Sequence, residues 1–249
     1  MSIAERKERE KEQRRSDMLA AAEKLFFARG YDGVTMDDIA KAVELNKATL
    51  YLYFKDKESL YFTVVLRGVR ILNAMVREHE GNGDTGSDKL WEIGRAYVTF
   101  AKKHPDYNRA YNYFYSGRFS LEGVAYPDDY LSNLPQMMDS GPKFWKNADI
   151  AANRAANEVA GQIFELNRQI FALMCSAVRA GMAEGKFRKD LDPAEAATVF
   201  TLLLESLPRM RPDLLAGLET QGVDREKFAR DIGAFMGFML AGAPKARKS

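Results

Sequence analysis

The stretch TMDDIAKAVELNKATLYLYFKDK, residues 35–57, decides the fold of the N-terminal part of the chain. The Thr35 hydroxyl can cap a short helix whose first turn is acidic, as the helix dipole favours. After a tight connection, Asn46 can cap a second short helix over residues 47–54. Two helices joined by so short a turn predict a helix-turn-helix, whose second helix enters the major groove of DNA.

The second helix of this pair is predicted to have two different faces. Helical periodicity places Leu50 and Phe54, four residues apart, on one face, where they would lock the helix to its domain. Lys47 and Tyr51 share a more polar face. That second face is free to meet DNA.

Phosphate contacts are predicted around this helix. Thr35 and Lys57 stand at helix N-termini, where backbone amides and the positive end of the dipole favour a phosphate oxygen. Tyr53 can add a further backbone contact, as can Arg14 and Arg15 in the charged segment upstream. That segment is interpreted as either a solvated helical extension or a mobile arm.

The flanking sequence completes a three-helix domain. Upstream, apolar residues recur at helical spacing from Met18 to Phe26, and the helix stops at Gly30, which suits the position after a helix end. Downstream, Asp56 can cap a helix that runs to about residue 80.

In this order and spacing, the residues resemble the DNA-binding domain of the TetR family of bacterial repressors. The resemblance rests on Leu25, Phe26, Gly30, Tyr31, Thr35, Ile39, Ala40, residues 47–54, Lys57 and Leu60. It implies phosphate contacts at Thr35 and Lys57, base contacts at Lys47, Ala48 and Thr49, and backbone contacts at Tyr51 and Tyr53. This chain has Leu52 where many relatives carry a polar residue.

Each of these side chains also has a plain structural alternative. Tyr51 and Tyr53 can be core aromatics that expose only the hydroxyl, and Lys47 and Lys57 can be solvated surface lysines. Residues 1–57 hold nearly as many acids as bases, and the whole chain carries a formal charge of +2. Affinity for DNA must therefore come from a local basic face.

Composition limits the remaining classes. Cys175, the only cysteine, lies in an apolar helical pattern, which fits a buried residue in a reducing compartment. We find no apolar stretch of the ~20 residues that span a bilayer, so we expect a soluble cytoplasmic protein with no membrane partner. His79 and His104 fall in different helices, without a metal-spaced cluster, phosphate loop or nucleophile elbow, so an enzyme, a metal site and a cofactor are not expected.

The whole chain is predicted to be all-α, since apolar residues recur at three and four positions and sustained alternation is lacking. Residues 1–57 would form the helix-turn-helix domain with its charged arm, and residues 58–249 a larger helical effector-binding and dimerisation domain. A helix over about residues 57–80 would join them. Residues 120–142 read as an irregular segment.

A homodimer is expected because two reading heads match two half-sites of a palindromic operator. The broad apolar stripes of residues 192–207 and 224–241 are the predicted interface, and by resemblance they would pair with their mates as a four-helix bundle. The predicted interface residues are Phe200, Leu203, Phe228, Ile232, Phe235, Met236 and Met239. The alternative is that both stripes pack only within one protomer.

A pocket for a small hydrophobic or aromatic effector is predicted between the helices of the larger domain. Its candidate residues are Tyr97, Phe100, His104, Tyr111, Phe114, Phe164, Phe171 and Met174. The alternative is that these residues are plain core, with His104 bonded to helix-end carbonyls. The sequence thus predicts a TetR-type repressor that an effector releases from DNA. The alternative function is a regulator that responds to a protein partner or to nothing.

Overall fold

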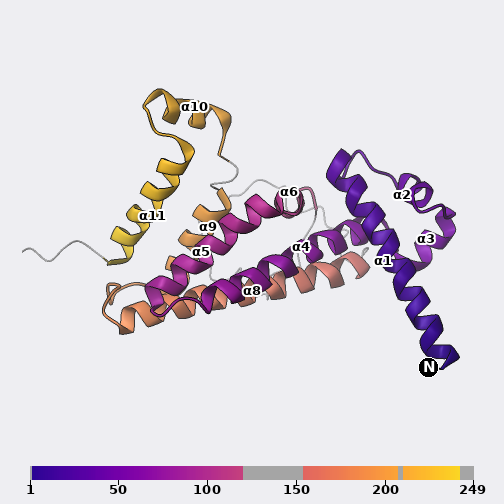
Figure 1. Cartoon of the computed structure of the whole chain (residues 1–249), viewed down its shortest axis with the longest axis horizontal. Coiled ribbons are helices and arrows are strands. Elements are labelled where there is room, and N and C mark those ends of the chain that lie inside the picture. Colours follow the sequence, from indigo (N-terminus) through magenta and orange to yellow (C-terminus); the bar gives the residue numbers. More distant parts are fainter. Residues whose placement is uncertain (1, 120–153, 207–209, 242–249) are drawn as a thin grey trace, which may run out of the picture. The chain divides into compact units, whose positions relative to one another are not determined.

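The computed structural model describes residues 2–119, 154–206 and 210–241. In these ranges the chain forms ten helices and no strand, which confirms the all-α class. The segment predicted to be irregular, residues 120–142, lies outside the described residues. The helices, labelled in Figure 1, are α1 (Ile3–Arg29), α2 (Met36–Ala42), α3 (Lys47–Tyr53), α4 (Lys57–Glu80), α5 (Gly86–Lys103), α6 (Pro105–Phe114), α8 (Arg154–Ala183), α9 (Pro193–Ser206), α10 (Pro212–Thr220) and α11 (Arg225–Ala241).

The helices gather into two compact units. Unit 1 comprises Met1–Arg70 and His104–Leu166, and unit 2 comprises Ile71–Lys103 and Asn167–Ser249. This division differs from the boundary at residue 57 expected from the sequence. The first half of α4 and all of α6 pack with the helix-turn-helix in unit 1.

The short helices of unit 1 begin where local chemistry dictates. The Thr35 side chain accepts a hydrogen bond from the Asp38 amide at 3.2 Å, and the Asp38 carboxylate accepts one from the Thr35 amide at 2.8 Å. Asn46 accepts from the Thr49 amide at 2.7 Å, and Asp56 accepts from the Ser59 amide at 2.7 Å. These three predicted caps are confirmed.

One hydrophobic core joins α1, α2, α3, the first half of α4, and α6 within unit 1. Met18, Ile39 and Leu50 are fully buried in it. The Tyr61 hydroxyl donates to the Ala110 carbonyl at 3.1 Å, and the Tyr107 hydroxyl donates to the Glu23 carboxylate at 2.6 Å. Aromatic and polar contacts therefore fix α6 to the same body as the helix-turn-helix.

In unit 2, α5 starts directly against α8. A Cβ at Gly86 would lie 2.1 Å from the Gly181 nitrogen and 2.4 Å from the Ala177 carbonyl oxygen, so only glycine fits there. The Gly86 amide donates to the Glu184 carboxylate at 3.0 Å. Helix α9 starts where the Asp192 side chain accepts from the amides of Ala194 and Glu195. Helix α10 was not predicted from the sequence.

Among the described helices, α4 alone is long and apolar enough to cross a membrane by length and composition. Within the protein, 67% of its most apolar stretch is buried. It is therefore explained as a core helix, with its apolar residues packed against other helices.

The close approach at Gly86 makes a prediction about stability. Gly86→Ala should lower the free energy of unfolding by about 1 to 3 kcal/mol, because the methyl group must push α5 away from α8. Gly161→Ala, at a helical glycine whose Cβ would meet nothing within 4 Å, is the control and should be neutral or stabilising. Denaturant unfolding monitored by circular dichroism measures both. A Gly86→Ala protein as stable as the parent would contradict the close packing.

Candidate DNA-binding surface

Helix α3 has one buried face and one open face. Leu50 is fully buried and Phe54 nearly so, whereas Tyr51 is 44% exposed and Leu52 83% exposed. Ala48 is exposed next to them. The periodicity correctly separated the face that anchors the helix from the face that is free. It did not single out Leu52, the most exposed large apolar side chain of the described chain, as a residue of the open face.

Lys47 stands at the start of α3 beside an acidic partner. Its ammonium nitrogen lies 2.8 Å from a carboxylate oxygen of Asp37, and both side chains are about half exposed. The hydrogen bond to Asp37 raises the pKa of Lys47, so the side chain remains a cation. An exposed ion pair of this kind is weak. The ammonium can therefore exchange Asp37 for a group on DNA.

Thr35 is exposed at the start of α2, but its hydroxyl is engaged. It donates to the Asp38 carboxylate at 2.6 Å and accepts from the Asp38 amide. The hydrogen bonds that the Thr35 hydroxyl and the Thr35 amide donate to this carboxylate, with a smaller contribution from Arg29, lower the pKa of Asp38 to about 2. Thr35 thus holds the first turn of α2 together, whatever further contact it makes.

Lys57 lies in a different setting from the one expected. Its ammonium donates to the Tyr31 and Val34 carbonyls, each at 3.1 Å, and lies 4.0 Å from the centre of the Tyr31 ring. Burial is the main cause that raises the pKa of Tyr31 to about 12, so the side chain keeps its hydroxyl proton. The Lys57 side chain links α4 to the connection between α1 and α2. The predicted phosphate contact through this ammonium would require it to leave those carbonyls.

The other predicted contact residues lie at the edges of the open face. Thr49 is half-buried, and its hydroxyl donates to the Asn46 side chain at 2.8 Å. Tyr53 is half-buried and packs against the core of unit 1. The structure therefore brings together Lys47, Ala48 and Tyr51 as an open face, with Leu52 added, and leaves Thr49, Tyr53 and Lys57 partly packed.

The eight residues predicted to line an effector pocket are divided between the two units. Phe100, Tyr111, Phe114 and Met174 are buried, and the other four are half-buried. None of the eight lines either of the two pockets described by the structure.

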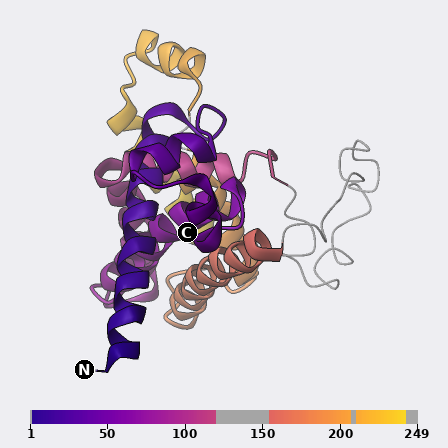
Figure 2. The same cartoon turned by 90° about the vertical axis from the view of Figure 1, so that its right-hand side faces the viewer.

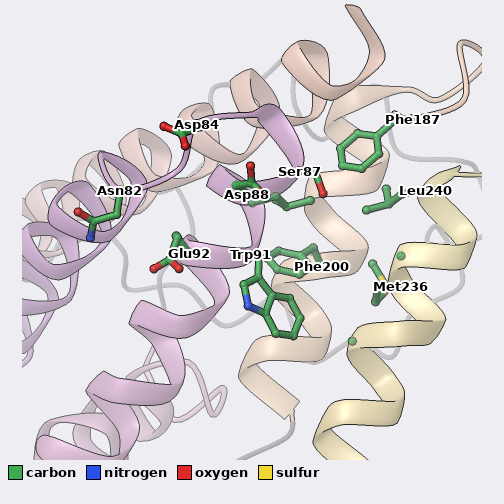
Figure 3. Close-up of a pocket in the computed structure, with 13 residues that line it drawn as sticks. Asn82, Asp84, Ser87, Asp88, Trp91, Glu92, Phe187, Phe200, Met236 and Leu240 are labelled. Atoms are coloured by element: carbon green, nitrogen blue, oxygen red, sulfur yellow. The ribbon is translucent and has the colours of Figure 1, made fainter. Parts of the chain in front are cut away.

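A pocket of about 400 Å³ is instead found within unit 2, between α5, α9 and α11 (Figure 3). Trp91 and Phe200 form part of its apolar wall, with Met236 of α11 across from them. Asp88 and Ser87 lie at its rim. Because these residues come from three separate helices, sequence periodicity could not assemble this site.

The seven residues predicted for a dimer interface fall into three groups. Phe235 is 61% exposed and Met239 is exposed as well, whereas Phe200 and Met236 are buried and line the pocket. Leu203, Phe228 and Ile232 are half-buried. The exposed apolar surface of α9 and α11 also includes Val199, Leu202 and Phe238, which the sequence analysis did not select.

Comparisons with known proteins find sequence similarity in the N-terminal region. Residues 18–64 match the family model described as bacterial regulatory proteins, tetR family. The chain is 38% identical over 69 residues to IcaR of Staphylococcus aureus (strain Newman), the HTH-type negative transcriptional regulator of the biofilm operon icaADBC. That match spans 28% of this chain and 37% of IcaR.

The fold as a whole is similar to solved TetR-family structures. A tetR-family regulatory protein from Rhodococcus RHA1 is 20% identical, with a TM-score of 0.58 over 92% of this chain and 98% of that one. AibR, crystallised with isovaleryl coenzyme A and operator DNA, is 16% identical, with a TM-score of 0.54 over 92% of this chain and 100% of AibR. Residues 18–64 thus match the tetR-family model, and the fold is similar to that of solved regulators of the tetR family.

The contacts of Lys57 predict a structural role for this side chain. Lys57→Ala should lower the free energy of unfolding by about 1.5 to 3 kcal/mol, because it removes a charged donor to two carbonyls. Lys47→Ala, which removes only an exposed ion pair, should leave the unfolding midpoint unchanged. Denaturant unfolding of both variants is the measurement. Equal midpoints for Lys57→Ala and the parent would show that the link carries no stability.

Proposed function

We propose that this protein is a transcriptional repressor that binds a palindromic operator as a homodimer and is released by a small-molecule effector in the cytoplasm. The observation that carries the proposal is the open face of α3, which is held outward by Leu50 and Phe54 on a TetR-type helix-turn-helix. IcaR, which the chain resembles in this region, is named as a negative transcriptional regulator. Repression is therefore the preferred direction of control.

The open face offers groups of complementary kinds to the major groove. Lys47 supplies a cation for a guanine edge or a phosphate, and the Tyr51 hydroxyl can bond a phosphate oxygen. Leu52 and Ala48 supply apolar surface of the kind that contacts a thymine methyl group. Thr35, Thr49, Tyr53 and Lys57 are assigned supporting roles at the margins, since their polar groups or rings already take part in packing.

Dimerisation follows from the exposed apolar residues of α9 and α11. Phe235, Phe238 and Leu202 are each more than half exposed, which is costly in water unless another surface covers them. A second copy related by two-fold symmetry offers the same residues in return. Two reading heads would then meet half-sites ~34 to 36 Å apart.

Binding of a small-molecule effector is supported by AibR, whose structure contains isovaleryl coenzyme A as well as operator DNA. In this chain the pocket beside Trp91 is lined by α9 and α11, the two helices assigned to the dimer. A ligand there acts only to the extent that it prefers one arrangement of those helices over another. The buried state of Phe100, Phe114 and Met174 favours the second candidate, a regulator without a small-molecule effector.

The DNA-binding role predicts a loss of affinity on changing the open face. Tyr51→Ala and Lys47→Ala should each weaken binding about 5- to 150-fold, as expected when a contact worth about 1 to 3 kcal/mol is removed. Fluorescence anisotropy at fixed salt, on fragments that the protein selects from its own genome, measures the affinity. Tyr115→Ala, at an exposed tyrosine outside the helix-turn-helix, is the control and should bind as the parent does.

If both open-face variants, shown to be folded dimers, bind as tightly as the parent, the recognition role of α3 is wrong. If they lose affinity for the selected fragments and for random duplex equally, these residues contact phosphates rather than bases.

The dimer predicts a change of mass in solution. The double substitution Phe235→Glu/Phe238→Glu should produce a folded monomer, because it places charges in the covered surface. Val98→Glu changes a comparably exposed apolar residue of α5 and should remain dimeric. Sedimentation equilibrium gives the mass, and circular dichroism confirms folding. Met236 is unsuitable for this test because it is buried within the protomer. A persistent dimer in the double variant would move the interface elsewhere.

A further inference from the structure

We infer that the N-terminal half of α1 is a second DNA-contact element, in which Lys7, Lys11 and Arg14 lie along the phosphate backbone beside the half-site. The inference rests on the proposed function and extends it. Helix α1 has 27 residues, but its buried residues begin only at Met18. The preceding residues 3–17 would make a helix ~22 Å long at 1.5 Å per residue.

This N-terminal extension of α1, residues 3–17, is exposed almost throughout. Of its side chains only Arg15 is half-buried. A helix that is polar on all sides gains nothing from packing, so it is held by pairs such as Arg6 with Glu10, whose side chains approach to 3.0 Å. Figure 2 shows the extension running away from the rest of the helix-turn-helix to the N-terminus. The extension is therefore an exposed helical rod that is available to bind a partner.

The charges of the extension are sorted by face. Lys7, Lys11 and Arg14 follow at four- and three-residue spacing, and the same stripe continues into Met18 and Ala22, which are fully buried in the domain. On one side this stripe is flanked by a strip of acidic residues, Glu5, Glu8 and Glu12, and on the other by Glu10 and Asp17. One face of the rod is therefore basic, and that face is continuous with the face that packs on the helix-turn-helix.

The contact of Arg15 shows on which side this basic face lies. Its guanidinium carbon is 5.1 Å from the centre of the Phe54 ring, at the end of α3. Arg15 neighbours Lys11, four residues earlier, on the helix surface. The basic face is thus turned toward the side of α1 that carries α3.

The ion pairs leave these bases available. Lys11 and Glu8 are 4.0 Å apart, and Arg15 and Glu12 are 3.9 Å apart, so both pairs are long and exposed. Such weak pairs are readily exchanged for contacts with the phosphate groups that duplex DNA carries at every base-pair step. A rod of ~22 Å runs past about six base pairs at 3.4 Å per step. The duplex flanking the half-site is therefore the occupant that fits in charge, length and continuity with α3.

The chain offers a matched pair of variants for the test. Lys7→Ala/Lys11→Ala removes two charges from the basic face, and Arg6→Ala/Arg9→Ala removes two from the other side of the same helix. Each double variant also breaks one ion pair, and alanine preserves the helix. Operator affinity of the full-length dimer is measured by anisotropy between about 50 and 200 mM salt, the range over which phosphate contacts dominate. A hydroxyl-radical footprint is recorded in parallel.

The basic-face variant should lose at least about tenfold in affinity at the lower salt. Its slope of log affinity against log salt should fall by about two per protomer, at 0.9 per phosphate contact, and its footprint should shorten at both outer edges. The Arg6→Ala/Arg9→Ala protein should keep the parental slope and footprint. Equal losses in both variants would reduce the effect to net charge and overturn the inference, as would no loss in the basic-face variant.

The outcome separates this inference from the proposed function. If Tyr51→Ala abolishes selective binding while the basic-face variant matches the parent, the repressor stands and the N-terminal extension does not contact DNA. If the parent itself selects no DNA, the proposed function fails, and the extension inference fails with it.

Discussion

The burial of one side of a very short helix, α3, is the constraint on which the candidate DNA-binding surface depends. Helix α3 has seven residues, too few to be stable in water by itself. It persists because Leu50 and Phe54 are buried in the core built by α1, α2 and α4, and because Asn46 caps its first turn. The same burial fixes the rotation of the helix. Tyr51 and Leu52 point outward because the opposite side has no freedom to turn.

Features set by neighbouring residues could be predicted from the sequence. The caps at Thr35, Asn46 and Asp56 depend on groups three residues away, and the two faces of α3 follow from a period of 3.6 residues. The partners of Lys57 were not predictable in this way, because its ammonium bonds carbonyls 23 and 26 residues earlier. A lysine at the start of a helix gives the same sequence signal whether its side chain contacts phosphate or the protein.

The C-terminal helices show a second limit of sequence reasoning. Helix α11 is apolar on two sides, one buried with Met236 and one exposed with Phe235 and Phe238. Periodicity therefore selected residues from both sides and could not rank them. The glycines of α11 add a signal that can be read only from the three-dimensional structure. A Cβ at Gly233 would lie 2.8 Å from the Trp91 ring, whereas one at Gly237 would meet nothing within 4 Å. That difference depends on contacts between residues far apart in the sequence, so the pocket beside Trp91 could not be predicted from the sequence.

The capping box at the start of α2 also determines how the stability of this helix depends on pH. A carboxylate with a lowered pKa stabilises the fold above its unfolded value near 3.8, and this contribution is lost only as the pH falls through about 2. Asp38 therefore stays ionised at any pH well above about 2. The start of α2 is thus insensitive to changes of pH near neutrality, so any effect of mild acid on the operator binding proposed above would have to come from another titratable group.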